Sequence, residues 1–244
     1  MKAVILAAGL GWRLESVTGG LPKCLVPVGG RAILDRMIER LVQAGLDRIV
    51  VVTGHRADDV ERHLDRSPDP AARSAERVFN PRYADWGNFH SLLVAEPAVG
   101  GEGFVKLDAD VVMDGALLPA LLRAPGPAAL ALDRSGPLGA EEMKARLDER
   151  GRVVELSKRI DPRAAFGESV GIDRIDAELA PRVWSELRRI IDLGETDEYY
   201  ERAYELLMEK GVRFSCADVS TCRWCEVDDA DDLAAAEALL AAMA

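Results

Sequence analysis

The chain begins with a nearly continuous apolar run, residues 2–8, that ends at Gly9. A run of this length without alternating polar residues is typical of a strand buried on both faces of a parallel sheet. Apolar residues recur at helical spacing over residues 33–42, and a second apolar run occupies residues 48–53. Strands joined through a helix of this length pair in parallel, so residues 2–53 predict a βαβ unit with a right-handed crossover.

The alternation of strands and helices continues, and it predicts an α/β fold with a Rossmann-like, mostly parallel sheet flanked by helices. The length favours a single domain over residues 1–244. Within it, segment 127–176 is interpreted as a small substrate-facing β insertion, because short strands follow one another there. Residues 67–74 and 83–89 are expected to be loops. Further strands are expected at 77–80, 103–108, 127–133, 145–148, 153–158, 169–175, 213–217 and 224–227, and helices at 57–65, 116–122, 177–191, 198–210 and from 229 onward.

The charge balance excludes several kinds of partner. The sequence has 31 Lys and Arg against 42 Asp and Glu, a formal net charge of −11, so its overall field repels nucleic acids and anionic lipids. No apolar run reaches the roughly 18 to 20 residues that cross a bilayer, and the first run lacks a basic, cleavable leader. Four cysteines are too few to cross-link a chain of this length, which suits a reducing compartment. We expect a cytoplasmic protein that binds neither nucleic acid nor membrane.

A glycine-containing loop follows the first predicted strand. Its backbone N–H groups can turn toward one point and cradle phosphate oxygens, and two nearby cations would add fixed positive charge. The alternative is a tight turn without a ligand. The dinucleotide-binding fingerprint does not fit, because its third glycine would stand at Leu14. The candidate phosphate-binding residues are Leu6, Ala7, Ala8, Gly9, Gly11, Arg13 and Lys23.

Two acidic residues, Asp108 and Asp110, stand at the end of the predicted strand 103–108. Residues two apart along a strand point to the same face, so both carboxylates cannot be buried without a counter-charge. A divalent cation would supply that charge. The alternative is a solvated strand end, since most carboxylates are simply exposed.

Three segments carry a resemblance to a known family. Leu6-x-x-Gly9-x-Gly11-x-Arg13 with Pro22-Lys23 resembles the signature loop of the sugar-phosphate and choline-phosphate nucleotidyltransferase superfamily. Residues 79–92, from Phe79 to Leu92, are similar to a segment of bacterial CTP:phosphocholine cytidylyltransferases. Trp224-Cys-Glu226-Val-Asp228 with the acidic residues after it resembles the C-terminal metal motif of the same group. The resemblance spans most of the chain in the same order and implies the nucleotide-diphospho-sugar transferase type of fold.

The resemblance also implies roles for individual residues. Asp110, Glu226 and Asp228 stand at the positions that hold Mg²⁺, whose preference for carboxylate oxygens suits this set. Arg13 and Lys23 would hold the nucleotide phosphates. The candidate catalytic residues are therefore Arg13, Lys23 and Asp110, together with Lys158, which is a lysine of the insertion.

Candidate acceptor-binding residues lie in two segments. Lys144, Lys158 and Glu168 fall in the insertion, where the resemblance places a phosphate-binding lysine and an acceptor-side glutamate, although scattered lysines are usually surface residues. Asp197 and Tyr200 belong to an acidic and aromatic segment that suits a cationic head group. Tyr200 also falls at helical spacing with later apolar residues, which fits an ordinary core contact equally well.

Three polar residues, Asn80, Asn88 and Ser91, are candidates for reading the edge of a base, because amides both donate and accept hydrogen bonds. Trp12 departs from the family pattern, which has Ser or Thr before the arginine. A phosphate-binding hydroxyl is thereby replaced by an indole that only donates.

The leading hypothesis is a Mg²⁺-dependent cytidylyltransferase that joins CTP, or another nucleoside triphosphate, to a small phosphorylated or phosphonylated acceptor and releases pyrophosphate. Phosphocholine is the first acceptor considered. The nearer alternative is a sugar-1-phosphate or polyol-phosphate nucleotidyltransferase that uses UTP, GTP or dTTP. A more distant alternative is a catalytically silent subunit that only binds nucleotide.

Overall fold

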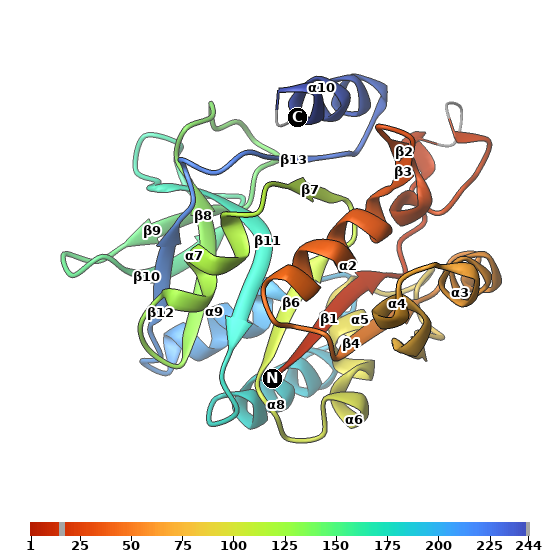
Figure 1. The fold of residues 1–244 in the computed structure, drawn as a ribbon. Helices are drawn as coiled ribbons and strands as arrows, with labels where there is room; N and C mark the ends of the chain where they lie inside the picture. The colour runs from red at the N-terminus through yellow and green to blue at the C-terminus, as the bar shows by residue number, and fades with distance from the viewer. Residues whose placement is uncertain (15–17, 243–244) are drawn as a thin grey trace.

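The computed structural model describes residues 1–14 and 18–242, and within them the core is one nine-stranded sheet (Figure 1). The strand order is β5-β4-β1-β6-β11-β8-β12-β10-β9. Two short pairs, β2 with β3 and β7 with β13, lie outside it. The strands are β1 (Lys2–Ala7), β2 (Pro27–Val28), β3 (Arg31–Ala32), β4 (Ile49–Thr53), β5 (Glu76–Phe79), β6 (Phe104–Asp108), β7 (Val111–Met113), β8 (Ala128–Asp133), β9 (Lys144–Leu147), β10 (Arg152–Ser157), β11 (Gly167–Ile175), β12 (Phe214–Asp218) and β13 (Trp224–Glu226).

Helices cover both faces of the sheet (Figure 1). The sequence of β1 is almost entirely apolar because both faces of the strand are buried. Val4 and Leu6 belong to one core cluster, whereas Ala3 and Ile5 belong to the other. The first cluster includes buried residues of α5, α6, α8 and α9, and the second those of α2, α3, α4 and α7. The helices are α2 (Ile33–Gln43), α3 (Ala57–Arg66), α4 (Pro70–Ser74), α5 (Phe89–Val94), α6 (Glu96–Val99), α7 (Leu117–Arg123), α8 (Ala180–Asp192), α9 (Glu201–Glu209) and α10 (Ala230–Ala241), with 3-10 turns η1 (Trp12–Leu14) and η2 (Lys23–Leu25).

The sheet has a parallel part and a mixed part. Strands β5, β4, β1 and β6 are parallel, so the predicted βαβ unit is confirmed. Strand β11 then pairs antiparallel with both β6 and β8, and β10 with both β12 and β9. The strands of segment 127–176 therefore extend the main sheet instead of forming a separate layer.

Two local predictions were wrong, and a short strand was not predicted. Part of the loop expected at 67–74 is α4, because Asp69 accepts a hydrogen bond from Ala71 N and Pro70 starts the helix. The loop expected at 83–89 ends one residue early, where α5 begins. The short strand β7 was not expected, since three apolar residues give no periodicity.

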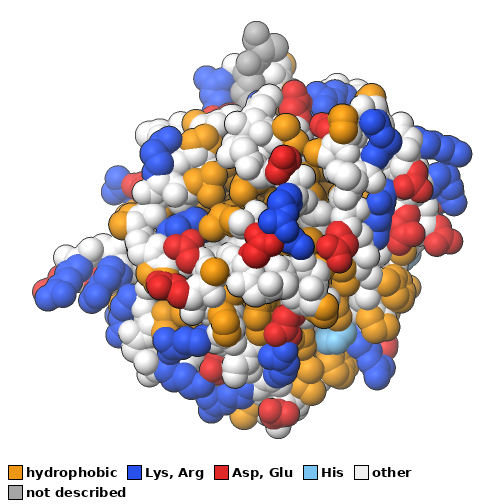
Figure 2. Space-filling view, turned by 60° about the horizontal axis from the view of Figure 1, so that its bottom comes forward, with side chains coloured by type: hydrophobic (Ala, Val, Ile, Leu, Met, Phe, Trp, Pro, Cys, Tyr) orange, Lys and Arg blue, Asp and Glu red, His pale blue; other side chains and the backbone are white. Residues whose placement is uncertain are grey.

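Charged side chains of both signs are interspersed with apolar ones over the face shown in Figure 2. The net charge is thus not concentrated on that face. Among the described residues, the structure has no helix with the length and apolar character that crossing a membrane requires.

Candidate functional site

A cavity of about 860 Å³ lies at the carboxyl ends of the parallel strands β1 and β6. Its lining includes the loop after β1, the loop before α5, parts of β11 and the β13 strand. Segments that are far apart in the sequence therefore meet at one edge of the sheet. The predicted site residues in the lining are Leu6, Ala8, Gly9, Gly11, Arg13, Lys23, Asn88, Ser91, Asp110, Lys158, Glu168, Glu226 and Asp228.

Three carboxylates meet in this cavity. One oxygen atom from each of Asp110, Glu226 and Asp228 lies within 4.8 Å of the others. The short β7–β13 ladder brings them together, because Glu226 pairs with Val111 and the N–H of Val227 donates to the carbonyl of Asp110 at 3.0 Å. The pairing joins residues more than a hundred positions apart in the sequence.

The electrostatics of the three carboxylates fit a divalent cation. Burial, followed by the charges of Asp110 and Asp228, raises the pKa of Glu226 to about 8. Asp110 Oδ1 is buried without a hydrogen-bond partner among the described residues. Carboxylate oxygens grouped in this way, one of them without a hydrogen-bond partner, are the donor set that Mg²⁺ prefers.

Two cations border the same cluster. Lys23 Nζ lies 2.6 Å from Asp110 Oδ2 and also forms an ion pair with Asp228. Burial works against its charge, but Asp110 and Asp228 outweigh it and raise the pKa of Lys23. Arg13 lies 3.5 Å from Asp228, and its side chain is half-exposed. Both cations thus offset part of the negative charge of the carboxylate cluster.

The loop after β1 has the backbone that a phosphate cradle needs. Gly11 has φ +60°, a left-handed conformation that favours glycine. The Trp12 side chain, 69% exposed, stands in the cavity lining, and the Arg13 guanidinium lies 5.5 Å from its ring centre. The indole therefore contacts Arg13 instead of the protein core.

The structure separates the candidate base-reading residues. Asn88 and Ser91 line the cavity, whereas Asn80 is fully buried and lies outside the lining, as does Ala7. Asn80 accepts a hydrogen bond from Arg82 N at 2.8 Å and donates to Ser91 Oγ at 2.9 Å. Its position supports the shape of the loop and not direct contact with a base.

The loop before α5 is held against the segment before α9. Gly87 N donates to the carbonyl of Thr196 at 2.8 Å, and a Cβ atom on Gly87 would overlap the carbonyl of Glu198. Asn88 Oδ1 accepts from Tyr200 N at 2.9 Å. Glycine is required at position 87 because the two backbones approach so closely.

Of the candidate acceptor-binding residues, some line the cavity and others do not. Lys158 and Glu168 line the cavity, whereas Asp197 is exposed outside the lining. Lys144 is buried and donates to the carbonyls of Gly139 and Glu142 at 2.8 and 3.0 Å, so it holds the loop before β9. Burial, followed by nearby carboxylates, raises the pKa of Glu168 to about 7.

A buried lysine beneath the cavity was not predicted as part of the site. Lys106 is fully buried, and its Nζ lies 3.2 Å from Asp108 Oδ2 and 3.1 Å from Asp173 Oδ2. The Tyr200 hydroxyl donates to Asp108 at 2.9 Å, so this tyrosine belongs to the buried network and not to the lining. A lysine inside an apolar strand is the sequence signal that such a network exists, because a buried charge needs partners.

A further carboxylate near Lys106 is Glu201, which is the first residue of α9 and lines the cavity. Burial raises the pKa of Glu201 from 4.5 to about 8, although Lys106 favours its charged form. Between these values the folded state holds a proton that the unfolded state has released, so the free energy of unfolding decreases as pH rises.

We therefore expect the unliganded protein to be less stable at about pH 8 than at about pH 5.5, and Glu201→Gln to reduce that difference. Urea unfolding at both pH values measures it. Glu209→Gln, an exposed change on the same helix, is the matched control and should keep the wild-type dependence. An unchanged dependence in Glu201→Gln would contradict the assignment.

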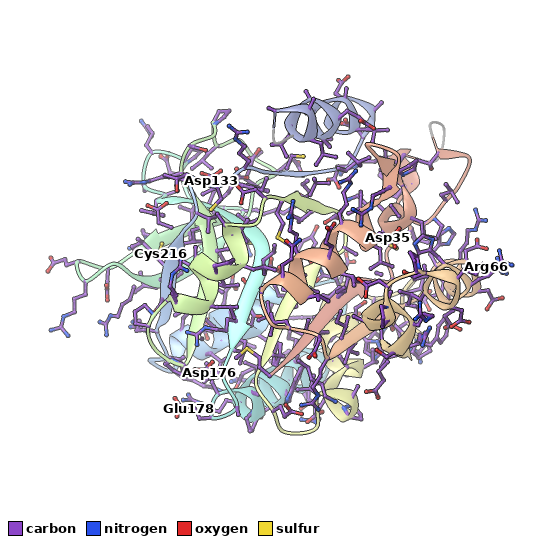
Figure 3. The ribbon with its side chains drawn as sticks, viewed as in Figure 1. Asp35, Arg66, Asp133, Asp176, Glu178 and Cys216 are labelled. Atoms are coloured by element: carbon purple, nitrogen blue, oxygen red, sulfur yellow. The ribbon has the colours of Figure 1, made fainter. Side chains whose placement is uncertain are left out.

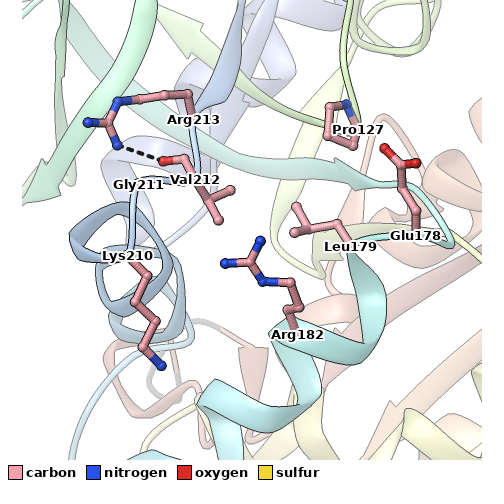
Figure 4. Close-up of a pocket in the computed structure, with 8 residues that line it drawn as sticks. All are labelled: Pro127, Glu178, Leu179, Arg182, Lys210, Gly211, Val212 and Arg213. Atoms are coloured by element: carbon pink, nitrogen blue, oxygen red, sulfur yellow. Dashed lines mark hydrogen bonds between the residues drawn. The ribbon is translucent and has the colours of Figure 1, made fainter.

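A second cavity, of about 420 Å³, lies near the start of α8 and the turn that follows α9 (Figure 4). Arg182, Lys210 and Arg213 line it, and no predicted site residue does. Figure 3 shows Glu178, of this second lining, near the bottom of the view, and Asp133, of the first lining, well above it. The larger cavity is therefore the candidate site.

The chain is similar to several known proteins. CMP-5'-(3-aminopropyl)phosphonate synthase of Streptomyces rubellomurinus is 31% identical over 240 residues, 95% of this chain and 37% of that protein. UTP–glucose-1-phosphate uridylyltransferase of Klebsiella pneumoniae is 30% identical over 66% of this chain and 55% of its own length. Choline-phosphate cytidylyltransferase of Streptococcus pneumoniae is 32% identical over 44% of each. The chain thus spans from about a third to about half of the length of these relatives.

Solved structures show the same fold. The inositol-1-phosphate CTP transferase from T. maritima has a TM-score of 0.79 at 23% identity, with 98% of this chain and 94% of that chain covered. The CTP:phosphocholine cytidylyltransferase from Streptococcus pneumoniae has a TM-score of 0.77 at 21% identity, with 98% of both chains covered. The predicted α/β fold is confirmed.

The sequence profile of the MobA-like NTP transferase domain matches residues 3–155, more than half of the chain. The match includes the glycine loop and Asp110, whereas Glu226 and Asp228 lie beyond it. The resemblance to nucleotidyltransferases is confirmed, and the chain belongs to the MobA-like NTP transferase family.

Proposed function

We propose that the protein transfers the cytidylyl group of CTP to a small phosphorylated or phosphonylated acceptor, with Mg²⁺ and with release of pyrophosphate. One observation carries the proposal: Asp110, Glu226 and Asp228 converge beside Arg13 and Lys23 in a single cavity. A carboxylate cluster flanked by cations suits a reaction whose substrates are a metal-bound triphosphate and a second phosphate. CTP is chosen because two of the relatives described above are named as CMP- or cytidylyl-transferring enzymes.

In this reaction an oxygen of the acceptor phosphate or phosphonate attacks the α-phosphorus of CTP. A new P–O bond forms, the bond from the α-phosphorus to the bridging oxygen breaks, and pyrophosphate leaves with that electron pair. The acceptor oxygen is largely ionised near neutral pH, so no strong base is required. Catalysis then consists of positioning and charge neutralisation.

The chain's own residues supply both. Gly9 and Gly11 present backbone N–H groups to the phosphates, and Arg13 and Lys23 neutralise the charge that collects on departing pyrophosphate. Lys158, which also lines the cavity, is available for the acceptor phosphate. Asp110, Glu226 and Asp228 would hold Mg²⁺, which when bound screens the charge on the transferred phosphoryl group.

The test measures pyrophosphate release with Mg²⁺ for CTP, UTP, GTP and ATP, each combined with aminoalkyl, choline, inositol and hexose phosphates. We expect turnover with CTP and a small phosphorylated or phosphonylated acceptor. Nucleotide binding without pyrophosphate release for every acceptor would contradict the proposal and favour a silent subunit.

A second candidate is a sugar-1-phosphate uridylyltransferase. It is supported by the relative named as a UTP–glucose-1-phosphate uridylyltransferase, which is similar over 66% of this chain. The same assay separates the two, because this candidate requires turnover with UTP and a hexose 1-phosphate and none with CTP.

A further inference from the structure

Glu201 is a buried carboxylate in the cavity lining that the reaction above does not use. It opens α9, its relative exposure is 7%, and it lines the cavity together with Asp108 and Tyr199. Glu201 Oε2 has no hydrogen-bond partner among the described residues. Leaving a buried carboxylate oxygen unpaired is costly, so this position is suited to a ligand that donates hydrogen bonds.

The charge of Glu201 is opposed only in part, by a lysine that other carboxylates share. Lys106 is the neighbouring buried cation, but its Nζ is bonded to the carbonyl of Gly171 at 2.9 Å and lies 3.1 to 3.2 Å from Asp173 and Asp108. Across the described residues, no ion pair includes Glu201. One buried lysine therefore faces three buried or half-buried carboxylates, and the local balance is short of positive charge.

Another nearly buried carboxylate of the lining, Asp133, does not offer the same site. It accepts hydrogen bonds from Ser135 N and Trp224 Nε1, both at 2.8 Å. Its oxygens are therefore already satisfied by the protein. The unpaired oxygen at Glu201 makes this residue the stronger position for a ligand cation.

The aromatic rings next to Glu201 indicate which kind of cation fits. Lys106 Nζ lies 3.5 Å from the ring centre of Tyr200, and Lys158 Nζ lies 5.0 Å from that of Tyr199. Each of the two rings therefore already has a lysine ammonium of the protein over its face. A quaternary ammonium is recognised mainly by open ring faces, whereas a primary ammonium donates N–H bonds to carboxylate oxygens.

We propose that Glu201 binds the primary ammonium group of the acceptor, so that the acceptor belongs to the class of aminoalkyl phosphates or phosphonates and not of choline or sugar phosphates. The inference rests on the proposed nucleotidyl transfer. The cationic end of the acceptor then lies at the start of α9. Tyr200 and Asp197, the head-group candidates from the sequence, give way to their neighbour Glu201.

The wild-type protein provides the first test. With CTP and Mg²⁺, we compare kcat/KM for phosphoethanolamine, 2-aminoethylphosphonate, phosphocholine, hexose 1-phosphates and n-propyl phosphate, which replaces the ammonium of phosphoethanolamine with a methyl group. We expect a primary-ammonium acceptor to exceed phosphocholine and n-propyl phosphate by at least about tenfold. Preference for phosphocholine or for a hexose 1-phosphate overturns the inference and leaves nucleotidyl transfer standing. No turnover with any acceptor overturns the proposed function itself.

The second test uses Glu201→Gln, which keeps the size of the side chain, with Glu209→Gln as the matched control on the same helix. The readout is the ratio of kcat/KM for phosphoethanolamine to that for n-propyl phosphate. Loss of a buried charged partner should lower this ratio on the order of a hundredfold in Glu201→Gln, while Glu209→Gln keeps it. An equal loss for both acceptors would show that Glu201 acts only on the fold and would overturn the inference.

Discussion

Replacement of Asp110 by alanine is expected to lower kcat by about a hundredfold or more at saturating Mg²⁺, because it removes a central carboxylate of the cluster. Asp110 lies between the two halves of the site: its carbonyl accepts from Val227 N, and its side chain contacts Lys23. The loss should appear mainly in kcat, since the glycine loop and Arg13 still bind the triphosphate. Steady-state pyrophosphate release measures it.

The matched control is Asp47→Ala, which removes an exposed carboxylate far along the chain from the cluster. It should keep wild-type kcat and the wild-type dependence on Mg²⁺ concentration. Mn²⁺ binding gives a readout that does not depend on turnover, and it should weaken only in Asp110→Ala. Retention of more than about a tenth of wild-type kcat by Asp110→Ala would show that the metal assignment is wrong.

Replacement of Lys106 by methionine is expected to lower the free energy of unfolding by about 3–5 kcal/mol. Methionine keeps the length of the side chain but leaves Asp108 and Asp173 without their buried counter-charge. These two carboxylates raise the pKa of Lys106 even though burial opposes its charge, so the lysine is ionised in the folded protein. Urea unfolding near neutral pH measures the change.

Two comparisons sharpen this second prediction. The double variant Lys106→Met with Asp173→Asn should recover part of the lost stability, because one uncompensated charge is removed along with the lysine. The difference between Lys106→Met and wild type should also shrink toward acidic pH, where the carboxylates take up protons. A loss below about 1 kcal/mol would mean that the ion pairs contribute little to folding.

Sequence patterns predicted most elements because local periodicity determines them. The apolar run at 2–8 is continuous because β1 is buried on both faces, and the helical spacing over 33–42 marks the face of α2 that enters the core. The residues around Gly9 and Gly11 were likewise found from local sequence alone. These features need no knowledge of distant parts of the chain.

What the sequence did not show depends on contacts between distant residues. The β7–β13 ladder, which brings Asp110 to Glu226, is too short to have a pattern of its own. Asn80 and Lys144 are polar residues that turned inward to hold loops, and residue type alone cannot distinguish that role from ligand binding. The unpaired oxygen of Glu201 could not be predicted, because it depends on which residues surround this side chain in the folded protein.

The contact between Gly87 and the segment before α9 bears on how the protein folds and opens. Asn88 and Tyr200, its neighbours on either side, are 112 residues apart in the sequence. Such a contact closes a long loop at a cost in chain entropy, so we expect it to form after the intervening strands have assembled. Movement of the loop before α5 away from the cavity requires its hydrogen bonds to Thr196 and Tyr200 to break. The shape of the loop before α5 therefore depends on a segment that lies more than a hundred residues later in the chain.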